Sequence, residues 1–344
     1  MTGLHRPAAL MALMLSVTAT SACAQAQSAP ARQSAQVAAP AGQQSGHFDW
    51  ITLGTMGGPM PSVQRAEPAN LLMRRGEAHL VDAGDGAATA MIRAGANYRD
   101  LRSIWISHIH FDHIGGLYGV LGLRLQTRTT APLTIYGPYG TKAIIDGLIA
   151  AMRPSARSGF GVPGEVPIDP GTGITVRELN DGDQITIGDI KVKVAENTHY
   201  TFPAGSEEGR LFRSFAFRFD TPDRSIAYTG DTGPSDKVTA LAAGADLLVS
   251  EMIDVESTMT AMHRRAGDMS PQDAANMETH LRTHHITTAD IGTMARQAGV
   301  KAVVVTHIAG GGAGTEPAAS QRYATEINRI YQGPVQIAVD GQKF

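Results

Sequence analysis

The chain has 344 residues, enough for one large domain or two small ones with a substantial buried core. Its formal net charge of −3 argues against a protein held to nucleic acid or to an anionic membrane by a global positive field. The single cysteine, Cys23, excludes an internal disulfide framework and any cysteine-rich zinc module, so a metal site would have to be built from His, Asp or Glu.

Residues 1–24 have the pattern of a secretory signal peptide, with an apolar run over residues 8–17 that is too short to span a bilayer. Cleavage after the small residues that follow would release a soluble periplasmic or secreted protein. Cleavage before Cys23 would leave a lipid anchor, but the usual leucine of that signal is missing. Residues 25–46, rich in Ala, Gln, Ser and Pro, are expected to be a disordered linker. The folded domain is expected over residues 47–344.

Short apolar runs bounded by Gly, Pro and Asp predict a strand-rich first half of this domain. The expected strands are 48–53, 69–74, 78–81, 100–107 and 133–136, and the expected helices are 87–94, 115–125 and 142–152. Residues 153–173 contain Pro and Gly without clear periodicity and are expected to form a loop.

The second half repeats the strand-rich pattern after about residue 180. The expected strands are 184–187, 190–195, 214–219, 225–228, 245–250, 302–306 and 335–339, and a helix is expected over 317–331. Residues 252–283 interrupt the pattern as a methionine-containing insertion that is expected to be helical and would either cover a site as a lid or pack on the main fold. Two similar halves predict an α/β fold of two sheets packed face to face with helices outside.

Four ligand-type residues, His108, His110, Asp112 and His113, follow the apolar stretch 104–107. In a continuing strand, His108 and His110 would point the same way, and the chain would then turn to present Asp112 and His113. Imidazole nitrogen and carboxylate oxygen are ligands for Zn²⁺ and its first-row neighbours. The stretch therefore predicts a metal site, and its crowding favours two ions rather than one.

Four more ligand-type residues stand at the ends of predicted strands: His199, Asp231, Glu251 and His307. Strand ends on one rim of a layered α/β fold converge, so these residues are expected to share one site with the histidine-rich stretch.

This set resembles the metallo-β-lactamase superfamily: His-x-His-x-Asp-His at 108–113, then His199, Asp231 and His307 in the same order. Within it, the chain looks most like the ribonuclease Z branch of zinc phosphodiesterases. Further matches are Leu53-Gly54-Thr55, Val81-Asp82-Ala83-Gly84, Ile135-Tyr136-Gly137-Pro138, Tyr228-Thr229-Gly230-Asp231-Thr232 and Ala298-Gly299-Val300-Lys301. The resemblance implies an αββα four-layer sandwich and a dinuclear zinc-dependent hydrolase that uses a metal-bridging hydroxide on phosphodiester or related ester substrates.

The resemblance also assigns roles to individual residues. One Zn²⁺ would be held by His108, His110 and His199, the other by Asp112, His113 and His307, and Asp231 would bridge both. Asp112 is counted as catalytic as well as a ligand, and Asp82 resembles the aspartate that orients the imidazoles. Mn²⁺ or Fe²⁺ would suit the same ligands.

A His–Glu pair supports the phosphodiesterase branch. His285, thirteen residues before Ala298, stands where ribonuclease Z relatives carry a histidine that protonates the leaving group or stabilises the transition state. Glu251 matches the glutamate that orients it, although Ser250 replaces the usual preceding histidine. Such a pair suits a general acid at neutral pH. The alternatives are a surface histidine, or His284 in the same role.

One departure makes tRNA an unlikely substrate. Ribonuclease Z proper carries a long basic arm between the positions of His199 and Asp231, whereas residues 200–230 here contain Glu207 and Glu208 and no lysine. A small ester or phosphodiester is expected instead. A homodimer is usual in the branch.

Other functions stay open on the same scaffold: a lactonase, an arylsulfatase, a β-lactam hydrolase, or a non-catalytic metal-binding protein. Retention of every ligand argues against the last. The remaining histidines, His47, His79, His263 and His280, are expected at the surface or in packing rather than as ligands.

Overall fold

The computed structural model describes residues 48–58, 62–265, 269–310 and 317–344. The expected signal peptide, its Cys23, the linker and His47 lie outside the described residues. Within these residues, every helix is too short or too polar to cross a membrane.

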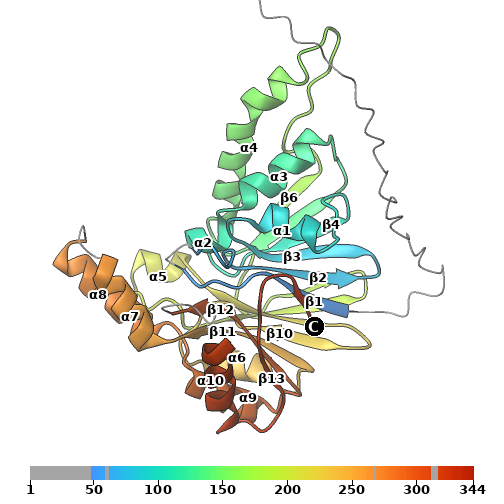
Figure 1. The fold of residues 1–344 in the computed structure, drawn as a ribbon. Coiled ribbons are helices and arrows are strands. Elements are labelled where there is room, and N and C mark those ends of the chain that lie inside the picture. The colour runs from blue at the N-terminus through green and yellow to red at the C-terminus, as the bar shows by residue number, and fades with distance from the viewer. Residues whose placement is uncertain (1–47, 59–61, 266–268, 311–316) are drawn as a thin grey trace, which may run out of the picture. The chain divides into compact units, whose positions relative to one another are not determined.

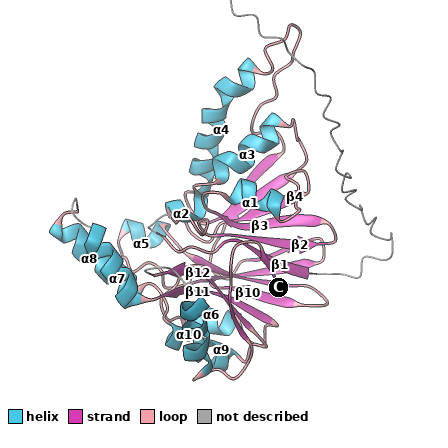
Figure 2. Ribbon diagram, in the orientation of Figure 1, coloured by secondary structure: helices cyan, strands magenta, loops and turns pink. Residues whose placement is uncertain are grey.

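Two mixed sheets pack face to face (Figures 1 and 2). The first has the order β14-β1-β2-β3-β4-β5-β6 and the second β13-β12-β11-β10-β9-β8-β7. The strands of the first sheet are β1 (Phe48–Gly54), β2 (Ala69–Arg74), β3 (Glu77–Ala83), β4 (Leu101–Trp105), β5 (Leu133–Gly137), β6 (Ile174–Glu178) and β14 (Gln342–Lys343). Those of the second are β7 (Gln184–Ile187), β8 (Ile190–Glu196), β9 (Phe215–Asp220), β10 (Ser225–Tyr228), β11 (Leu247–Ile253), β12 (Val303–Ala309) and β13 (Val335–Ile337).

The division of the chain near residue 180 matches the division between the sheets, with one exception. β14, at the C-terminus, returns to the first sheet and pairs with β1, where Ile51 lies opposite Lys343. The last strand thereby links the two halves of the chain.

Helices cover the outer face of each sheet, so the αββα four-layer sandwich is confirmed (Figure 2). The first sheet packs against α1 (Ala87–Arg93), α3 (Leu117–Gln126) and α4 (Thr141–Ser158). The second packs against α6 (Asp236–Leu241), α9 (Thr288–Ala298) and α10 (Pro317–Asn328). The short helices α2 (Phe111–Ile114) and α5 (Glu207–Leu211) lie in loops.

Aromatic side chains, with aliphatic ones between them, fill the space between the sheets. Three of them, Phe215, Phe217 and Phe219, occupy alternate positions of β9, so they all point to the same face of the sheet and are buried. Trp105 stacks on Tyr136 with ring centroids 4.1 Å apart. Each buried Phe contributes roughly 1.5–3 kcal/mol, so this layer is a main source of stability.

Several sequence-based boundaries were wrong. The helix expected to end at 152 continues through Pro154 to Ser158, although Pro154 cannot donate a backbone hydrogen bond there. The edge strand β6 was not predicted, although Ile174 and Val176 alternate with polar residues, because the strand is short and only partly buried. Helix α9 was also missed, although Thr287 and Asp290 form a capping box at its start.

The insertion forms two helices, α7 (Val255–Arg265) and α8 (Pro271–Thr283), which project together from the end of β11 (Figure 1). They have a small hydrophobic cluster of their own. Its members are Ile253, Met259, Leu281 and Ala309, with Val255, Met262 and Met277 packed against them. The insertion therefore touches the sandwich through a narrow base, which leaves one face of α8 available to border a cavity.

Candidate metal centre

The histidine-rich stretch forms a loop and a short helix rather than a continuing strand. β4 ends at Trp105, two residues before the expected end, because Ser107 donates its backbone N–H and its hydroxyl to the carboxylate of Asp82 instead of extending the strand (2.8 Å each). His110 then stands at the N-terminus of α2, which carries Asp112 and His113. The predicted alternation of His108 and His110 along a strand was wrong, but the loop still brings their rings together.

His108, His110 and His199 form the first group of ligand-type side chains. His108 Nε2 lies 3.1 Å from His110 Nδ1, and His199 Nε2 lies 3.1 Å from the same atom. His199 comes from the loop after β8 in the other sheet. Its second ring nitrogen, Nδ1, lies 3.1 Å from the backbone carbonyl of His284, which fixes the ring so that Nε2 faces the group.

Asp112, His113, Asp231 and His307 form the second group. Asp231 Oδ2 lies 3.0 Å from His307 Nε2, 3.3 Å from His113 Nε2 and 3.9 Å from His108 Nε2. Asp112 Oδ2 lies 3.6 Å from both His113 Nε2 and His307 Nε2. Asp231 therefore stands between the two groups.

The donors fit divalent metal ions. Ligands about 2.0–2.1 Å from a tetrahedral Zn²⁺ lie roughly 3.3 Å from one another, close to the separations within each group. Within the described residues, the buried atoms His113 Nε2, His307 Nε2 and Asp231 Oδ1 make no hydrogen bond. Buried polar atoms that approach one another without pairing are expected where they converge on a shared cation.

Proton affinities in this group are strongly perturbed. Burial lowers the pKa of His307, but the carboxylates of Asp231 and Asp112 outweigh it and raise the pKa to about 10. A cation that binds His307 must therefore displace a proton across the neutral range, so its affinity depends on pH.

Glu251 and His307 lie inside strands, not at strand ends as the sequence predicted. β11 continues to Ile253 and β12 to Ala309, and the register between them shifts after Ser250, so that Glu251 faces two residues of β12. His307 occupies this bulge with a left-handed backbone (φ 43°). A bulge re-aims side chains, which explains how a residue within a strand reaches the site.

Asp82 holds several ligands in place from behind. Its Oδ2 accepts hydrogen bonds from Tyr228 Oη and Ser107 Oγ (2.8 Å each) and lies 2.9 Å from His113 Nδ1. Ser107 Oγ also lies 3.1 Å from His108 Nδ1, so one carboxylate orients both histidines. Asp82 itself has φ 57°, an uncommon backbone conformation that the surrounding hydrogen bonds maintain.

The expected His–Glu pair is present, and it involves His285 rather than His284. His285 Nδ1 donates to Glu251 Oε2 at 2.7 Å, and both side chains are buried. Burial lowers the pKa of His285, but the charge of Glu251 and this hydrogen bond outweigh it and raise the pKa above its usual value. Glu251 is held in turn by the backbone N–H of Thr232 at 2.5 Å.

His280, which the sequence predicted to be a surface or packing residue rather than a ligand, lies beside the ligand groups. Its ring centroid lies 4.8 Å from that of His199 and 5.2 Å from that of His285. Its Nδ1 lies 2.8 Å from His284 Nδ1, while His284 Nε2 lies 2.5 Å from Thr201 Oγ1. The i, i+4 spacing of His280 and His284, next to His285, was the signal that could have found it.

The other histidines are located as expected where the structure describes them. His79 is buried and lies 2.8 Å from Ser103 Oγ, which makes it a packing residue. His263 is exposed on α7.

Both ligand groups open into a cavity of about 700 Å³. The lining residues are Gly58, Glu67, His110, Phe111, Asp112, Tyr200, Thr201, Phe202, Asp231, Met269, Asp273, Asn276, Met277, His280, Leu281, His284, His285 and His307. One side is formed by ligand-type residues and the other mostly by α8 and by aromatic side chains.

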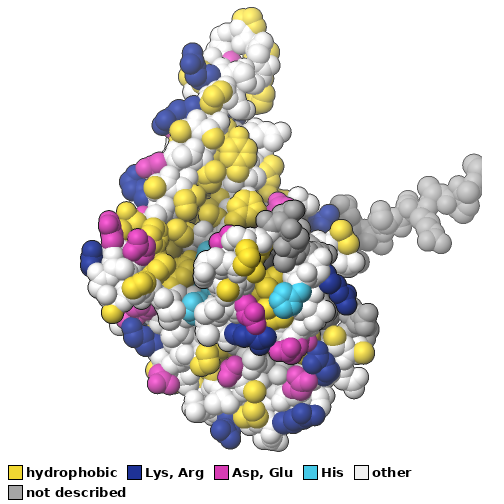
Figure 3. Space-filling model, turned by 90° about the vertical axis from the view of Figure 1, so that its left-hand side faces the viewer, with side chains coloured by type: hydrophobic (Ala, Val, Ile, Leu, Met, Phe, Trp, Pro, Cys, Tyr) yellow, Lys and Arg dark blue, Asp and Glu magenta, His cyan; other side chains and the backbone are white. Residues whose placement is uncertain are grey.

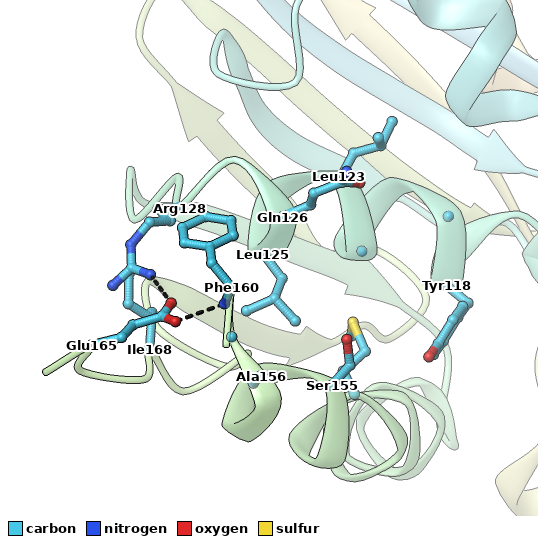
Figure 4. Close-up of a pocket in the computed structure, with 14 residues that line it drawn as sticks. Tyr118, Leu123, Leu125, Gln126, Arg128, Ser155, Ala156, Phe160, Glu165 and Ile168 are labelled. Atoms are coloured by element: carbon cyan, nitrogen blue, oxygen red, sulfur yellow. Dashed lines mark hydrogen bonds and ion pairs between the residues drawn. The ribbon is translucent and has the colours of Figure 1, made fainter. Parts of the chain in front are cut away.

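A second cavity, of about 610 Å³, lies between α3, α4 and the loop that follows α4 (Figure 4). Its Glu165 accepts hydrogen bonds from Arg128 (2.9 Å) and from the backbone N–H of Phe160 (2.6 Å). None of the residues that line it, within the described ranges, is a histidine.

Sequence comparisons agree with this geometry. A family model for the β-lactamase superfamily domain matches residues 79–308. Ribonuclease Z from Mycobacterium sp. (strain KMS) is 30% identical over 259 residues, which cover 75% of this chain and 83% of that protein. Ribonuclease Z from Mycobacterium avium (strain 104) is 28% identical over 260 residues, covering 75% and 85%.

Solved structures show the same fold. The metallo-beta-lactamase fold protein YhfI from Bacillus subtilis aligns with a TM-score of 0.60 at 18% identity, over 86% of this chain and 98% of that chain. The short form of human tRNase Z aligns with a TM-score of 0.58 at 23% identity, with the same coverage. From the family match, the relatives and the fold together, the chain belongs to the β-lactamase superfamily and is a metal-dependent hydrolase of the branch that includes ribonuclease Z.

Proposed function

We propose that this chain is an exported hydrolase that uses two divalent cations, zinc foremost, to cleave phosphodiester or related small ester bonds. The observation that carries the proposal is the buried His285–Glu251 pair, whose His285 lines the same cavity as residues of both ligand groups. A general acid is most useful where a poor leaving group must be protonated, as in phosphodiester cleavage.

In this proposal each described ligand has a defined place. One cation is held by His108, His110 and His199, the other by Asp112, His113 and His307, and Asp231 lies between them. When bound, the cations would supply Lewis acidity and a water of lowered pKa. Asp82 keeps His108 and His113 in the required orientation.

His285 is proposed to carry the proton for the leaving group. Its Nδ1 is committed to Glu251, so its Nε2 remains to face the substrate. Because Glu251 raises the pKa of His285, the imidazole holds its proton further into the neutral range.

A small substrate is proposed in place of tRNA. Between His199 and Asp231 the structure has only α5 and two strands of the second sheet, and Glu207 and Glu208 occupy the first turn of α5. Residues 200–230 hold four carboxylates and four arginines, so this segment has no excess of positive charge with which to bind nucleic acid. Export rests on the sequence of residues 1–24, and a homodimer stays a prediction from the resemblance.

The test is an assay of the full chain, loaded with Zn²⁺ or Mn²⁺, against bis(p-nitrophenyl) phosphate, a simple lactone, an aryl sulfate and a cephalosporin. For a phosphodiester with a poor alkoxide leaving group, assayed beside these substrates, we expect turnover to fall about a hundredfold or more in His285→Ala. The loss should be smaller for bis(p-nitrophenyl) phosphate, whose nitrophenolate leaves without being protonated. His263→Ala is the matched control, because His263 is an exposed histidine on α7 outside the cavity.

The opposite result is equally clear. Turnover of only the lactone, sulfate or β-lactam, unchanged in His285→Ala, would keep the metal centre but reject the phosphodiesterase. Metal content and thermal unfolding of each variant would show that a loss of activity is not a loss of fold.

A further inference from the structure

Helix α8 presents one continuous face to the cavity. The lining residues from this helix and its C-cap are Asp273, Asn276, Met277, His280, Leu281 and His284. Their spacing of three or four residues places them along one stripe of the helix. The helix therefore forms a wall of the cavity along its whole length.

The middle of this wall carries two apolar side chains, Met277 and Leu281, beside Asn276 and His280. Met277 is partly buried and Leu281 is buried, and both belong to the small hydrophobic cluster of the insertion. Tyr200 and Phe202 also line the cavity, with ring centroids 5.4 Å apart, and the Tyr200 ring lies 5.3 Å from that of His110. Apolar surface thus reaches from the ligand groups outward.

The rim continues this apolar surface. Phe111, Phe202 and Met269 line the cavity and remain 72%, 37% and 38% exposed. Figure 3 shows the side of the molecule that carries α8, where hydrophobic side chains gather at mid-height with histidine side chains among them. Large apolar side chains exposed beside a site are typical of surfaces that bind apolar groups.

The charged side chains that line the cavity disfavour a substrate whose leaving group carries a negative charge in addition to that of the phosphodiester. Among the described residues that line it, none is Lys or Arg, whereas Glu67 and Asp273 add carboxylates to those of Asp112 and Asp231. Asp112 and Asp231 face the proposed cations, but a leaving group with its own negative charge would also meet the carboxylates of Glu67 and Asp273, which no Lys or Arg among the described lining residues offsets.

The wall also lies next to the proposed general acid. His285 follows the C-cap of α8, and its ring centroid lies 5.2 Å from that of His280. His280 in turn lies about one helical turn from Met277. An oxygen atom protonated by His285 would therefore carry its substituent against α8.

Resting on the function proposed above, we infer that the inward face of α8 is the subsite for the leaving group of the substrate, and that this group is apolar and uncharged. Met277 and Leu281 pack against it from the helix, and Tyr200 and Phe202 close the other side. This subsite separates the chain's substrates from polynucleotides, in which both sides of the cleaved bond carry further phosphates.

The experiment compares aryl methyl phosphodiesters whose leaving phenols are matched in acidity and bear no charge, a carboxylate or a trimethylammonium group. We expect kcat/KM for the neutral leaving group to exceed that for the carboxylate by about tenfold or more. In Met277→Lys, the neutral-to-carboxylate ratio should fall by about tenfold, with most of the change in KM.

Met262→Lys is the matched control. Met262 packs against the same small cluster but does not line the cavity, and the substitution adds the same charge. We expect its neutral-to-carboxylate ratio to stay within about twofold of that of the original chain, a change of less than ~0.5 kcal/mol.

A preference for the carboxylate or the trimethylammonium group, or equal use of all three, would overturn the subsite. So would a Met277→Lys variant that slows all three substrates equally. If no diester is cleaved, or cleavage does not depend on Asp231, the proposed function itself fails. Turnover that depends on Asp231 but lacks leaving-group discrimination rejects only the subsite.

Discussion

Two cavities among the described residues are nearly equal in volume, about 700 and 610 Å³, yet they differ in the ligand-type and titratable side chains beside them. The first lies beside the seven ligand-type side chains and the His285–Glu251 pair, and His113, Asp231 and His307 among them have buried atoms without a hydrogen bond. The second lies between helices on one side, and its partly buried carboxylate, Glu165, is paired with Arg128 (Figure 4). Volume alone therefore does not identify a functional site.

The physical difference lies in how polar groups are satisfied. In the second cavity both carboxylate oxygens of Glu165 accept hydrogen bonds from the protein, so they need no bound cation. In the first, His113, Asp231 and His307 crowd together with unsatisfied atoms, which costs free energy unless a cation binds. The predictions below test whether function follows this difference.

The largest effect is expected from Asp231→Ala. Removal of the carboxylate between the two ligand groups should lower activity roughly a thousandfold. Weaker binding of the cations would raise the activation free energy by several kcal/mol. Metal content, measured by mass spectrometry after gel filtration, should fall in the same variant. Full activity in Asp231→Ala would contradict the assignment of the first cavity as the site.

A smaller effect is expected from Asp82→Asn. Asn tolerates the left-handed backbone of this position, but its amide cannot accept hydrogen bonds at both oxygen positions. It would lose either the bond from the backbone N–H of Ser107 at Oδ1 or the contacts of Ser107 Oγ and His113 Nδ1 at Oδ2. Metal affinity should fall about 10- to 100-fold, as measured by competition with a chromogenic chelator. Unchanged affinity would show that the two histidines are oriented without Asp82.

The third prediction concerns pH. Glu251 raises the pKa of His285, so Glu251→Gln should lower it. The protonated imidazole is the active form of a general acid, so activity falls as pH rises through this pKa. In Glu251→Gln the fall should begin about one pH unit lower or more, as expected for loss of an opposite charge in contact.

The pH profile of kcat/KM measures this shift. An unmoved basic limb would mean that His285 does not control it. Metal content must be followed alongside, because Glu251 Oε2 also lies 3.9 Å from His307 Nδ1.

The smallest effect is expected in the second cavity. Glu165→Gln removes the ion pair with Arg128, whose guanidinium is partly exposed, so the free energy of unfolding should fall by at most ~1 kcal/mol. Turnover should remain within about twofold of the original. A large loss of activity would show that the second cavity contributes to function despite its satisfied polar groups.

The sequence predicted which ligand-type residues come together because most of them are close to one another in the chain. His108, His110, Asp112 and His113 lie within six positions, so any compact turn brings them close whatever the exact backbone. For this reason the four side chains lie close to the other ligand-type residues, although the prediction that His108 and His110 continue a strand was wrong. His199 and Asp231 also follow strands closely, as predicted.

The sequence-based predictions were wrong where the position of a side chain depends on contacts between residues far apart in the chain. Glu251 and His307 were expected at strand ends, but the register shift between β11 and β12 aims them into the site from within strands. His280 was expected at the surface or in packing, but it faces the cavity. The rotation of α8 that places it there is set by packing of Leu281 and Met259, which the local sequence does not reveal.

The sequence by itself determined the identity and order of the ligand-type residues, the division into two strand-rich halves and the family resemblance. These follow from residue types and short spacings, which survive errors in element boundaries. The tertiary structure decided the bulge at His307, the choice of His285 over His284 as the partner of Glu251, and the wall that α8 builds across the cavity. Each depends on strand register or helix rotation, and these are set by contacts between residues far apart in the chain.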